Sequence, residues 1–282
     1  MKKYILVIDN FDNSKVLLKK ILLVAPDDLL VLFISTPNTQ DQHAPSPTIE
    51  ASVEEKIKQV KSHSIEYLQA ATEEQLAEQI IQRSEKFEAD LILLQKPRYT
   101  EDSHETNFAK LLLRGSIKAN LFFCRNKKWK SPPDIMCALD VADTDATHKA
   151  LDEFVFNAAS STKLSNLEAR LHLASIIPVS KVSKEFDIVD ESRLLQKKGD
   201  SFREKLQKFN ERSPDQSATI HVTAGVPEKQ ITLLVKKNHI DVLVMGNVGR
   251  KGLKGFVLGN TAEKIITNLA ADVLVINNFS SG

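Results

Sequence analysis

Short apolar runs alternate with stretches of helical periodicity along the chain, and this alternation constrains the fold more than any other feature. The runs have the length of buried strands, and the stretches between them repeat apolar residues on one helix face. Strands that alternate with helices predict a parallel sheet covered by helices on both faces. In the first half the predicted strands are Tyr4–Ile8, Leu29–Ile34, Asp90–Leu94 and Asn120–Cys124, and the predicted helices are Ser14–Val24, Ala51–Ser62, Glu73–Phe87 and Phe108–Ile117.

The same cycle of elements runs twice. A basic stretch ending in two prolines, Asn126–Pro133, is typical of a linker, because proline continues neither a helix nor a strand. After it, Asp140 ends a strand as Asp9 does, and Asp241 opens a strand as Asp90 does. The sequence therefore predicts two doubly wound α/β domains, residues 1–127 and 132–282. The predicted strands of the second are Ile135–Leu139, Ala169–Ile177, Ala218–Val222, Asp241–Met245 and Asp272–Ile276, with helices Glu191–Glu211 and Glu228–Lys237.

Composition argues against several classes of protein. Lys and Arg number 38 against 37 Asp and Glu, so no net field draws the chain onto nucleic acid or a membrane. No apolar stretch approaches the roughly 20 residues that span a bilayer, and the N-terminal apolar run is too short for a signal peptide. Two cysteines make no disulfide framework. We expect a cytoplasmic protein without membrane insertion, and we do not expect nucleic acid as a partner.

Glycine is concentrated in one segment. The chain has 9 glycines, and six of them lie between Gly225 and Gly259. A strand runs into Gly246, which stands at its carboxyl end, where open α/β sheets bind ligands. Gly259 then opens a helix, whose free N–H groups favour an anion. Arg250, Lys251 and Lys254 lie between these glycines, so the segment predicts a cradle for phosphate groups.

Other motifs do not fit this segment. The spacings G-x-G-x-x-G and G-x-x-x-x-G-K-[ST] are both absent from the sequence. The stretch GRKG at 249–252 is similar to the RNA-clamping loop of KH domains, but that loop joins two helices, and here a strand precedes it. The seven histidines show no metal-ligand spacing, and we expect His172 and His221 to be core residues of strands. No metal site and no catalytic group are predicted.

The pattern G-x-x-G, nine residues, then G-N, set between two apolar strands, resembles the universal stress protein family. The strand, GxP turn and helix over His221–Val235 and the strand that ends in Asp140 resemble it as well. The likeness covers 132–282, and the whole chain resembles the tandem-domain, UspE-like subgroup. The resemblance implies two Rossmann-like domains of the adenine nucleotide alpha hydrolase-like type, each a mostly parallel five-stranded sheet with helices on both faces. It also implies binding of ATP or another adenine nucleotide, with Mg²⁺ left open.

The resemblance assigns roles to residues of the second domain. Asp140 would face the ribose, and Leu173, placed after the second strand, would flank adenine. The remaining residues implied at this site are Ala138 and Met245 near adenine, Gly246, Gly249, Gly259, Asn260 and Thr261 at the phosphates, and Arg250 beside them. Asn260 stands where the family more often has Ser or Thr. Plainer interpretations stay open: Asp140 as a turn or helix cap, Gly249 and Gly252 as loop glycines, and Arg250 and Lys251 as solvated side chains.

The first domain departs from the pattern. Gln95, Arg98 and Asn107 align with the three motif glycines, and the intervening stretch contains a proline and no glycine. We therefore expect a degenerate domain that holds no triphosphate in the family manner.

Two functions remain open from the sequence. The first is a stress-response protein with one adenine-nucleotide site, in the second domain, and at most slow ATP hydrolysis. The alternative is a non-enzymatic scaffold that binds partner proteins, with an apolar ligand pocket in the first domain as a variant. Self-association, or pairing of the two domains through Asn120–Cys124 and Asp272–Ile276, is a further expectation.

Overall fold

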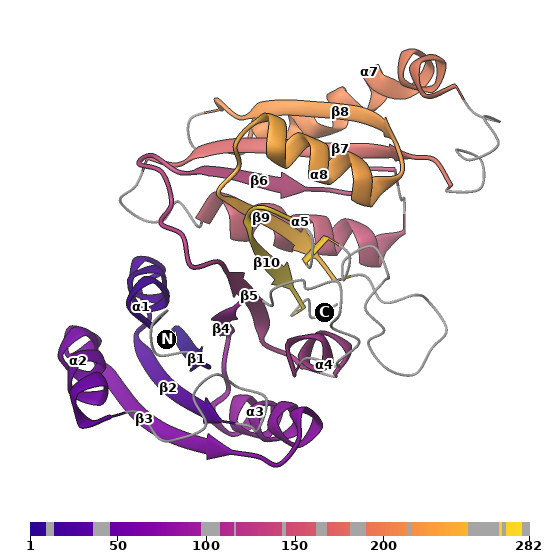
Figure 1. The fold of residues 1–282 in the computed structure, drawn as a ribbon. Helices are drawn as coiled ribbons and strands as arrows, with labels where there is room; N and C mark the ends of the chain where they lie inside the picture. The colour runs from indigo at the N-terminus through magenta and orange to yellow at the C-terminus, as the bar shows by residue number, and fades with distance from the viewer. Residues whose placement is uncertain are drawn as a thin grey trace. The chain divides into compact units, whose positions relative to one another are not determined.

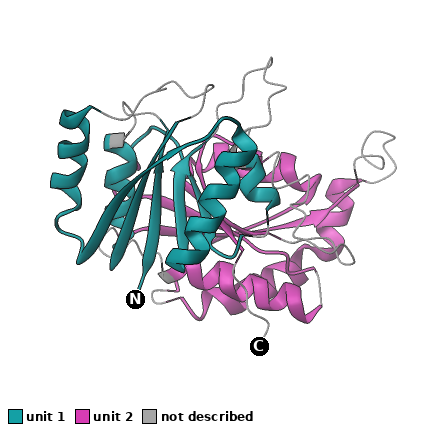
Figure 2. Cartoon of the chain, turned by 90° about the horizontal axis from the view of Figure 1, so that it is seen from below, with its two compact units in different colours: residues 1–128, 249–258 teal, residues 129–248, 259–282 magenta. Residues whose placement is uncertain are grey.

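The computed structural model of the 282-residue chain describes residues 1–9, 14–35, 46–96, 108–115, 117–142, 145–161, 168–180, 190–213, 216–247, 265–266 and 269–277. These residues form two compact units (Figure 2). Unit 1 holds the described residues up to Lys128, and unit 2 holds those from Trp129 on. Each unit is a sheet with helices packed on it (Figure 1).

Unit 1 is built on five parallel strands in the order β3-β2-β1-β4-β5. The central strands are almost wholly buried, which explains their continuous apolar sequences. The strands are β1 (Lys3–Ile8), β2 (Asp28–Ser35), β3 (Ser62–Gln69), β4 (Leu91–Gln95) and β5 (Asn120–Cys124), and the helices are α1 (Ser14–Leu23), α2 (Pro47–Ile57), α3 (Glu73–Phe87) and α4 (Phe108–Arg114).

Unit 2 repeats this arrangement with five parallel strands in the order β10-β9-β6-β7-β8. Its strands are β6 (Asp134–Ala138), β7 (Arg170–Pro178), β8 (Thr219–Gly225), β9 (Val242–Gly246) and β10 (Asp272–Ile276), and its helices are α5 (Ala146–Ser161), α7 (Glu191–Asn210) and α8 (Pro227–Lys237). The rings of Phe156 on α5 and Phe209 near the end of α7 pack 5.2 Å apart, so these helices share one face of the sheet. The predicted α/β fold is confirmed for both sheets.

The repeated aspartates at the starts of β4 and β9 have the same structural role. Asp90 accepts the backbone N–H of Lys3 at 2.9 Å, and Asp241 accepts the N–H of Asp134 at 3.0 Å. In both units the aspartate thereby ties the start of one central strand to the start of its neighbour. The sequence repeat that pairs Asp90 with Asp241 thus corresponds to the same hydrogen bond in both units.

Three elements depart from the predictions. The strand β3 was not predicted, because its sequence SHSIEYLQ is mostly polar and its residues are largely exposed, as fits the edge of a sheet. The helix predicted at Ala51–Ser62 runs from Pro47 to Ile57, with proline at its first turn. The helix α5 was also not predicted.

Candidate functional site

The carboxyl ends of the two central strands of unit 2 lie side by side. Ala138, the last residue of β6, is the register partner of Met245 on β9. Ala138 also pairs with Ala174 on β7, whose carbonyl accepts the N–H of Leu139 at 2.9 Å. Ala138 is partly exposed and Met245 is 9% exposed, so a small apolar surface borders the strand ends.

Asp140 lies two residues beyond β6 and is exposed. Its backbone N–H donates to Oδ1 of Asp152 on α5 at 2.9 Å, which fixes the chain at this point. In the described part of the chain its own carboxylate has no hydrogen-bond partner. The start of α5 is capped instead by Asp145, whose Oδ1 accepts the N–H of Thr147 at 2.9 Å. The interpretation of Asp140 as a helix cap is therefore wrong, and its carboxylate is left facing solvent.

Gly246 ends β9 directly against α5. A Cβ atom added there would lie 2.5 Å from Cδ2 and 2.6 Å from Cγ of Leu151, closer than any real side-chain contact. Glycine at this position therefore lets α5 pack onto the sheet. This packing role was not predicted, and it is compatible with a backbone contact to a ligand.

Asn247 is a feature of the site that sequence reasoning missed. Its N–H donates to the carbonyl of Ile276 at 3.0 Å, and its Nδ2 donates to Oδ1 of Asn277 at 2.8 Å. The residue is 3% exposed, and its Oδ1 has no hydrogen-bond partner among the described residues. The two asparagines tie the end of β9, where the glycine segment begins, to the end of β10.

Leu173 corrects one prediction. The family resemblance implies a place after the second strand, but Leu173 is the fourth residue of β7 and is fully buried, between Cys137 and Ile220 in register. Its side chain belongs to the core, because the strand begins at Arg170 and continues to Pro178. The residues at the carboxyl end of β7 are Ile177, Pro178 and Val179.

Five of the ten predicted site residues lie outside the described residues. They are Gly249, Arg250, Gly259, Asn260 and Thr261. The predicted phosphate cradle is therefore not tested by the structure. The described part of the site is the strand-end group of Ala138, Asp140, Met245 and Gly246.

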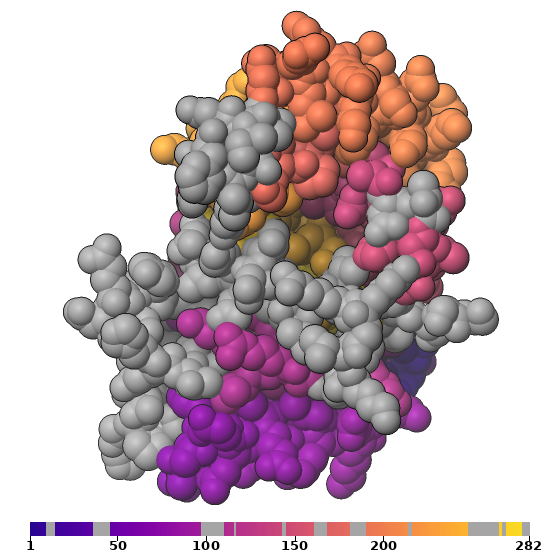
Figure 3. All heavy atoms as spheres, turned by 90° about the vertical axis from the view of Figure 1, so that its right-hand side faces the viewer, coloured from indigo at the N-terminus to yellow at the C-terminus, as the bar shows by residue number. Residues whose placement is uncertain are grey.

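A cavity of about 500 Å³ lies between α5 and α7 of the same unit. Lys205 crosses it to donate to the carbonyl of Val141, 2.7 Å away, and Arg212 pairs with Glu153 at 2.8 Å. Its other lining residues are Lys149, Asp152, Lys208 and Phe209. The helix α7, coloured orange, lies at the surface in the space-filling view (Figure 3). The cavity begins one residue beyond Asp140, but its wall already holds the Arg212–Glu153 ion pair and the hydrogen bond from Lys205 to Val141.

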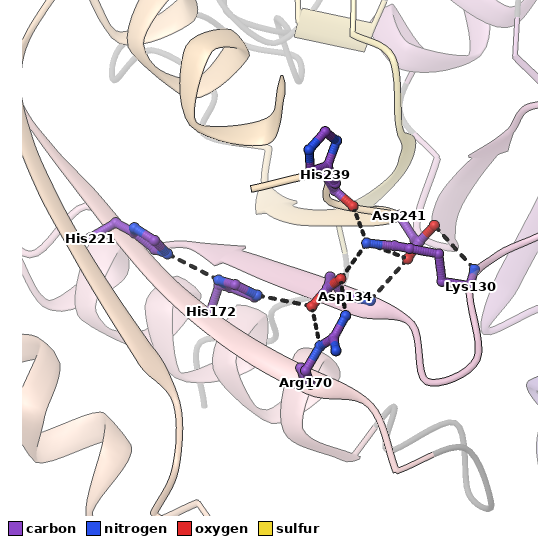
Figure 4. Close-up of polar contacts among 7 residues, drawn as sticks. All are labelled: Lys130, Asp134, Arg170, His172, His221, His239 and Asp241. Atoms are coloured by element: carbon purple, nitrogen blue, oxygen red, sulfur yellow. Dashed lines mark hydrogen bonds and ion pairs between the residues drawn. The ribbon is translucent and has the colours of Figure 1, made fainter. Parts of the chain in front are cut away.

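The opposite ends of the strands carry a second polar cluster (Figure 4). Asp134, at the start of β6, accepts two hydrogen bonds of 2.7 Å from Arg170 and contacts Lys130. His172 Nε2 lies 3.2 Å from Asp134 Oδ1, and His172 Nδ1 lies 3.0 Å from His221 Nε2. Burial would raise the pKa of Asp134, but hydrogen bonds from Arg170, Lys130 and His172 outweigh it and hold that pKa well below its usual range. Burial, followed by the neighbouring His172 and Lys237, lowers the pKa of His221 to about 4.

Other classes of site were sought in the described residues. They contain no group of three or more His, Cys, Asp or Glu side chains arranged to hold a metal ion. None of their helices is long and apolar enough to cross a membrane.

Comparison with known proteins decides the family. The model of the universal stress protein family matches residues 133–277, about half of the chain and nearly the whole of unit 2. The chain belongs to the universal stress protein family. This confirms the resemblance drawn from the glycine spacing.

Related universal stress proteins match part of the chain. It is 29% identical over 167 residues to Universal stress protein E of Salmonella typhi, which covers 55% of this chain and 50% of that protein. It is 34% identical over 87 residues to Universal stress protein MJ0531 of Methanocaldococcus jannaschii, which covers 30% of this chain and 49% of that one. The chain spans about half the length of the curated relatives it matches.

Solved structures share the fold across the whole chain. A functionally unknown protein from Pseudomonas aeruginosa PAO1 superposes with a TM-score of 0.70 at 23% identity, covering 98% of this chain and 92% of that one. A universal stress protein from Archaeoglobus fulgidus superposes with a TM-score of 0.61 at 14% identity, covering 99% and 97%. At these identities the likeness concerns the fold.

Proposed function

We propose that this universal stress protein binds ATP or another adenine nucleotide at the carboxyl ends of β6 and β9 in unit 2. The observation that carries the proposal is the exposed carboxylate of Asp140 just beyond the end of β6. Its backbone is fixed by Asp152, while its carboxylate is exposed and has no hydrogen-bond partner in the described part of the chain. A carboxylate in this position can accept hydrogen bonds from the two ribose hydroxyls.

The neighbouring residues suit the rest of the ligand. Ala138 and Met245 offer an apolar border for the base, and the end of β7 at Ile177–Val179 takes the place first given to Leu173. The spacing of Gly246, Gly249 and Gly259, with Asn260 and Thr261, supports contact with the phosphates, and Arg250 adds positive charge beside them. Mg²⁺ would accompany the phosphates.

The proposal is for binding without a dedicated catalytic group. We assign no nucleophile and no adjacent base to the site. Any ATP hydrolysis would be slow and would come from positioning of the phosphates alone. Cys124 and Cys137 are buried and form no disulfide, which suits a reducing compartment, and we propose a cytoplasmic location.

Calorimetric titration with ATP tests this function. Asp140→Asn should weaken binding about tenfold, because the amide is a poorer acceptor for the ribose hydroxyls than the carboxylate. The matched control is Asp200→Asn, which changes an exposed aspartate on α7 away from the strand ends. Equal affinity in Asp140→Asn and the control would remove Asp140 from the site. Absence of nucleotide binding by the unchanged protein would favour the scaffold function instead.

A further inference from the structure

The imidazole rings of His172 and His221 face each other across two neighbouring strands, far from the nucleotide site. They are the third residues of β7 and β8, near the amino ends of these strands, whereas Asp140 lies at the carboxyl ends. The two nitrogens His172 Nδ1 and His221 Nε2 are 3.0 Å apart, and the ring planes differ by only 14°. Neither the proposed function nor the sheet needs this arrangement.

The tautomers of the pair follow from Asp134. Because Asp134 is held as a carboxylate by Arg170, it can only accept, so His172 Nε2 carries the proton in the contact of 3.2 Å. When His172 is neutral, its Nδ1 bears a lone pair, and His221 Nε2–H can donate to it. Two neutral imidazoles are the form in which this pair can bind a metal ion.

We propose that His172 and His221 form a two-histidine site for a borderline divalent cation such as Zn²⁺, Cu²⁺ or Ni²⁺. Imidazole nitrogen prefers these ions to Mg²⁺ or Ca²⁺. Metal–nitrogen bonds of about 2.0–2.1 Å put two ligands about 2.9–3.4 Å apart at angles from square to tetrahedral. The observed separation of 3.0 Å falls in this range, so a rotation of the rings replaces the shared proton by the cation. Water fills the remaining positions.

Asp134 supplies the outer support that such sites require. Metal-binding histidines commonly donate their other ring N–H to a carboxylate, which fixes the ring and raises its basicity. Here that carboxylate is itself anchored by the two hydrogen bonds from Arg170 (Figure 4). His221 is only partly buried and lies on β8, the outer strand of unit 2, which gives the ion a way in.

Binding of the ion to the neutral rings neither takes up nor releases a proton. His221 moves its single proton from Nε2 to Nδ1, by exchange with water, and then binds the ion through Nε2. His172 keeps its proton on Nε2, facing Asp134. Neutral imidazoles thus enter the site, and no proton is released at pH values where both rings are already neutral.

The test uses the 282-residue chain without an affinity tag, freed of metal by a chelator and titrated with Zn²⁺. Ring ¹⁵N spectra should show large shifts at His172 Nδ1 and His221 Nε2, while His172 Nε2 stays protonated. His172→Gln and His221→Gln should each lower the affinity for Zn²⁺ at least tenfold. The matched control is His239→Gln, because His239 contributes its backbone carbonyl to Lys130 and leaves the pair intact.

Two further variants separate a metal site from a hydrogen-bonded structural pair. Asp134→Asn should weaken Zn²⁺ binding by about 10–100-fold, the effect usual for an outer carboxylate. Lys237→Gln should strengthen it, because Lys237 places positive charge near His221. If the ring nitrogens of the unchanged protein do not respond to Zn²⁺ at about 1 mM, or the His239→Gln control loses as much affinity as the pair variants, the proposal is wrong.

Discussion

The two units share one backbone plan but differ where their central strands end. Lys96 N–H donates to the carbonyl of Cys124 at 2.7 Å, just as Asn247 N–H donates to the carbonyl of Ile276 at 3.0 Å. Yet unit 1 has Gln95 and Lys96 at this place, and unit 2 has Gly246 and Asn247. The same backbone hydrogen bond thus forms with either pair of residues, and at this place the units differ in their side chains. Unit 2 keeps a glycine that lets α5 approach β9, and unit 1 does not.

The amino ends show a second difference. By strand register, the residues of unit 1 equivalent to His172 and His221 are Leu30 and Glu66. Leu30 is buried in the core, and Glu66 pairs with Arg83 at 2.7 Å. The histidine pair therefore belongs to unit 2 alone. One fold carries different chemistry at both ends of its two sheets.

The largest expected effect concerns the stoichiometry of nucleotide binding. The unchanged protein should bind one ATP per chain, and Gly249→Val should abolish that binding, because a branched side chain blocks approach of the backbone to phosphate. Calorimetry gives both values, with circular dichroism to confirm that the variant is folded. Binding of two ATP molecules per chain would contradict the proposed difference between the units, because unit 1 would then bind nucleotide without the glycines.

The next effect concerns packing. Gly246→Val should destabilise the protein by about 1–3 kcal/mol, because its side chain would collide with Leu151. Gln95→Val, the matched change in unit 1, should cost less, since that position already holds a larger side chain. Urea unfolding of both variants measures the difference, and adding Leu151→Ala to Gly246→Val should restore part of the loss. No recovery in this double variant would remove Leu151 as the cause.

A smaller effect is expected from the basic residues of the glycine segment. Neutralising Arg250, Lys251 and Lys254 together should weaken ATP binding by about 1–2 kcal/mol, roughly tenfold, and the loss should shrink at high salt. Gly259→Val should cost more. Titration of both variants at low and high salt is the measurement. Complete loss in the charge variant with retained binding in Gly259→Val would make side-chain charge the main determinant.

The smallest effect concerns pH. The pKa of His221 is lowered to about 4 from an ordinary value near 6.5, so the unfolded chain binds more protons between these values. Stability from this group is complete above pH 6.5 and is lost as pH falls towards 4. Because His221 is partly exposed and its charge is screened by solvent, we expect a loss of about 1 kcal/mol. Thermal melts in the presence of a chelator should show a shallower dependence for His221→Gln than for the unchanged protein, and parallel curves would contradict this prediction.

Much of the fold could be predicted from the sequence, because buried parallel strands must be apolar on both faces. The runs at Tyr4–Ile8 and Asp241–Met245 are of this kind, and they coincide closely with β1 and β9. The strand β3 could not be predicted in this way, because an edge strand is half-exposed and its sequence resembles that of a loop. The family could also be predicted, since the spacing of Gly246, Gly249 and Gly259 is a local property of the chain.

The site depended more on tertiary structure. Sequence alone placed Asp140 at the end of a strand, but only the fold showed that Asp152 fixes its backbone and that Asp145 caps the helix in its place. Leu173 was misplaced because the family resemblance assigned it to the adenine, although the predicted strand Ala169–Ile177 already contained it. The pairing of His172 with His221 could not be foreseen, since 49 residues separate them and only the register of β7 against β8 brings their rings together. Periodicity along the chain determines which residues are buried, whereas contacts between distant segments are decided by the packing of the sheet and its helices.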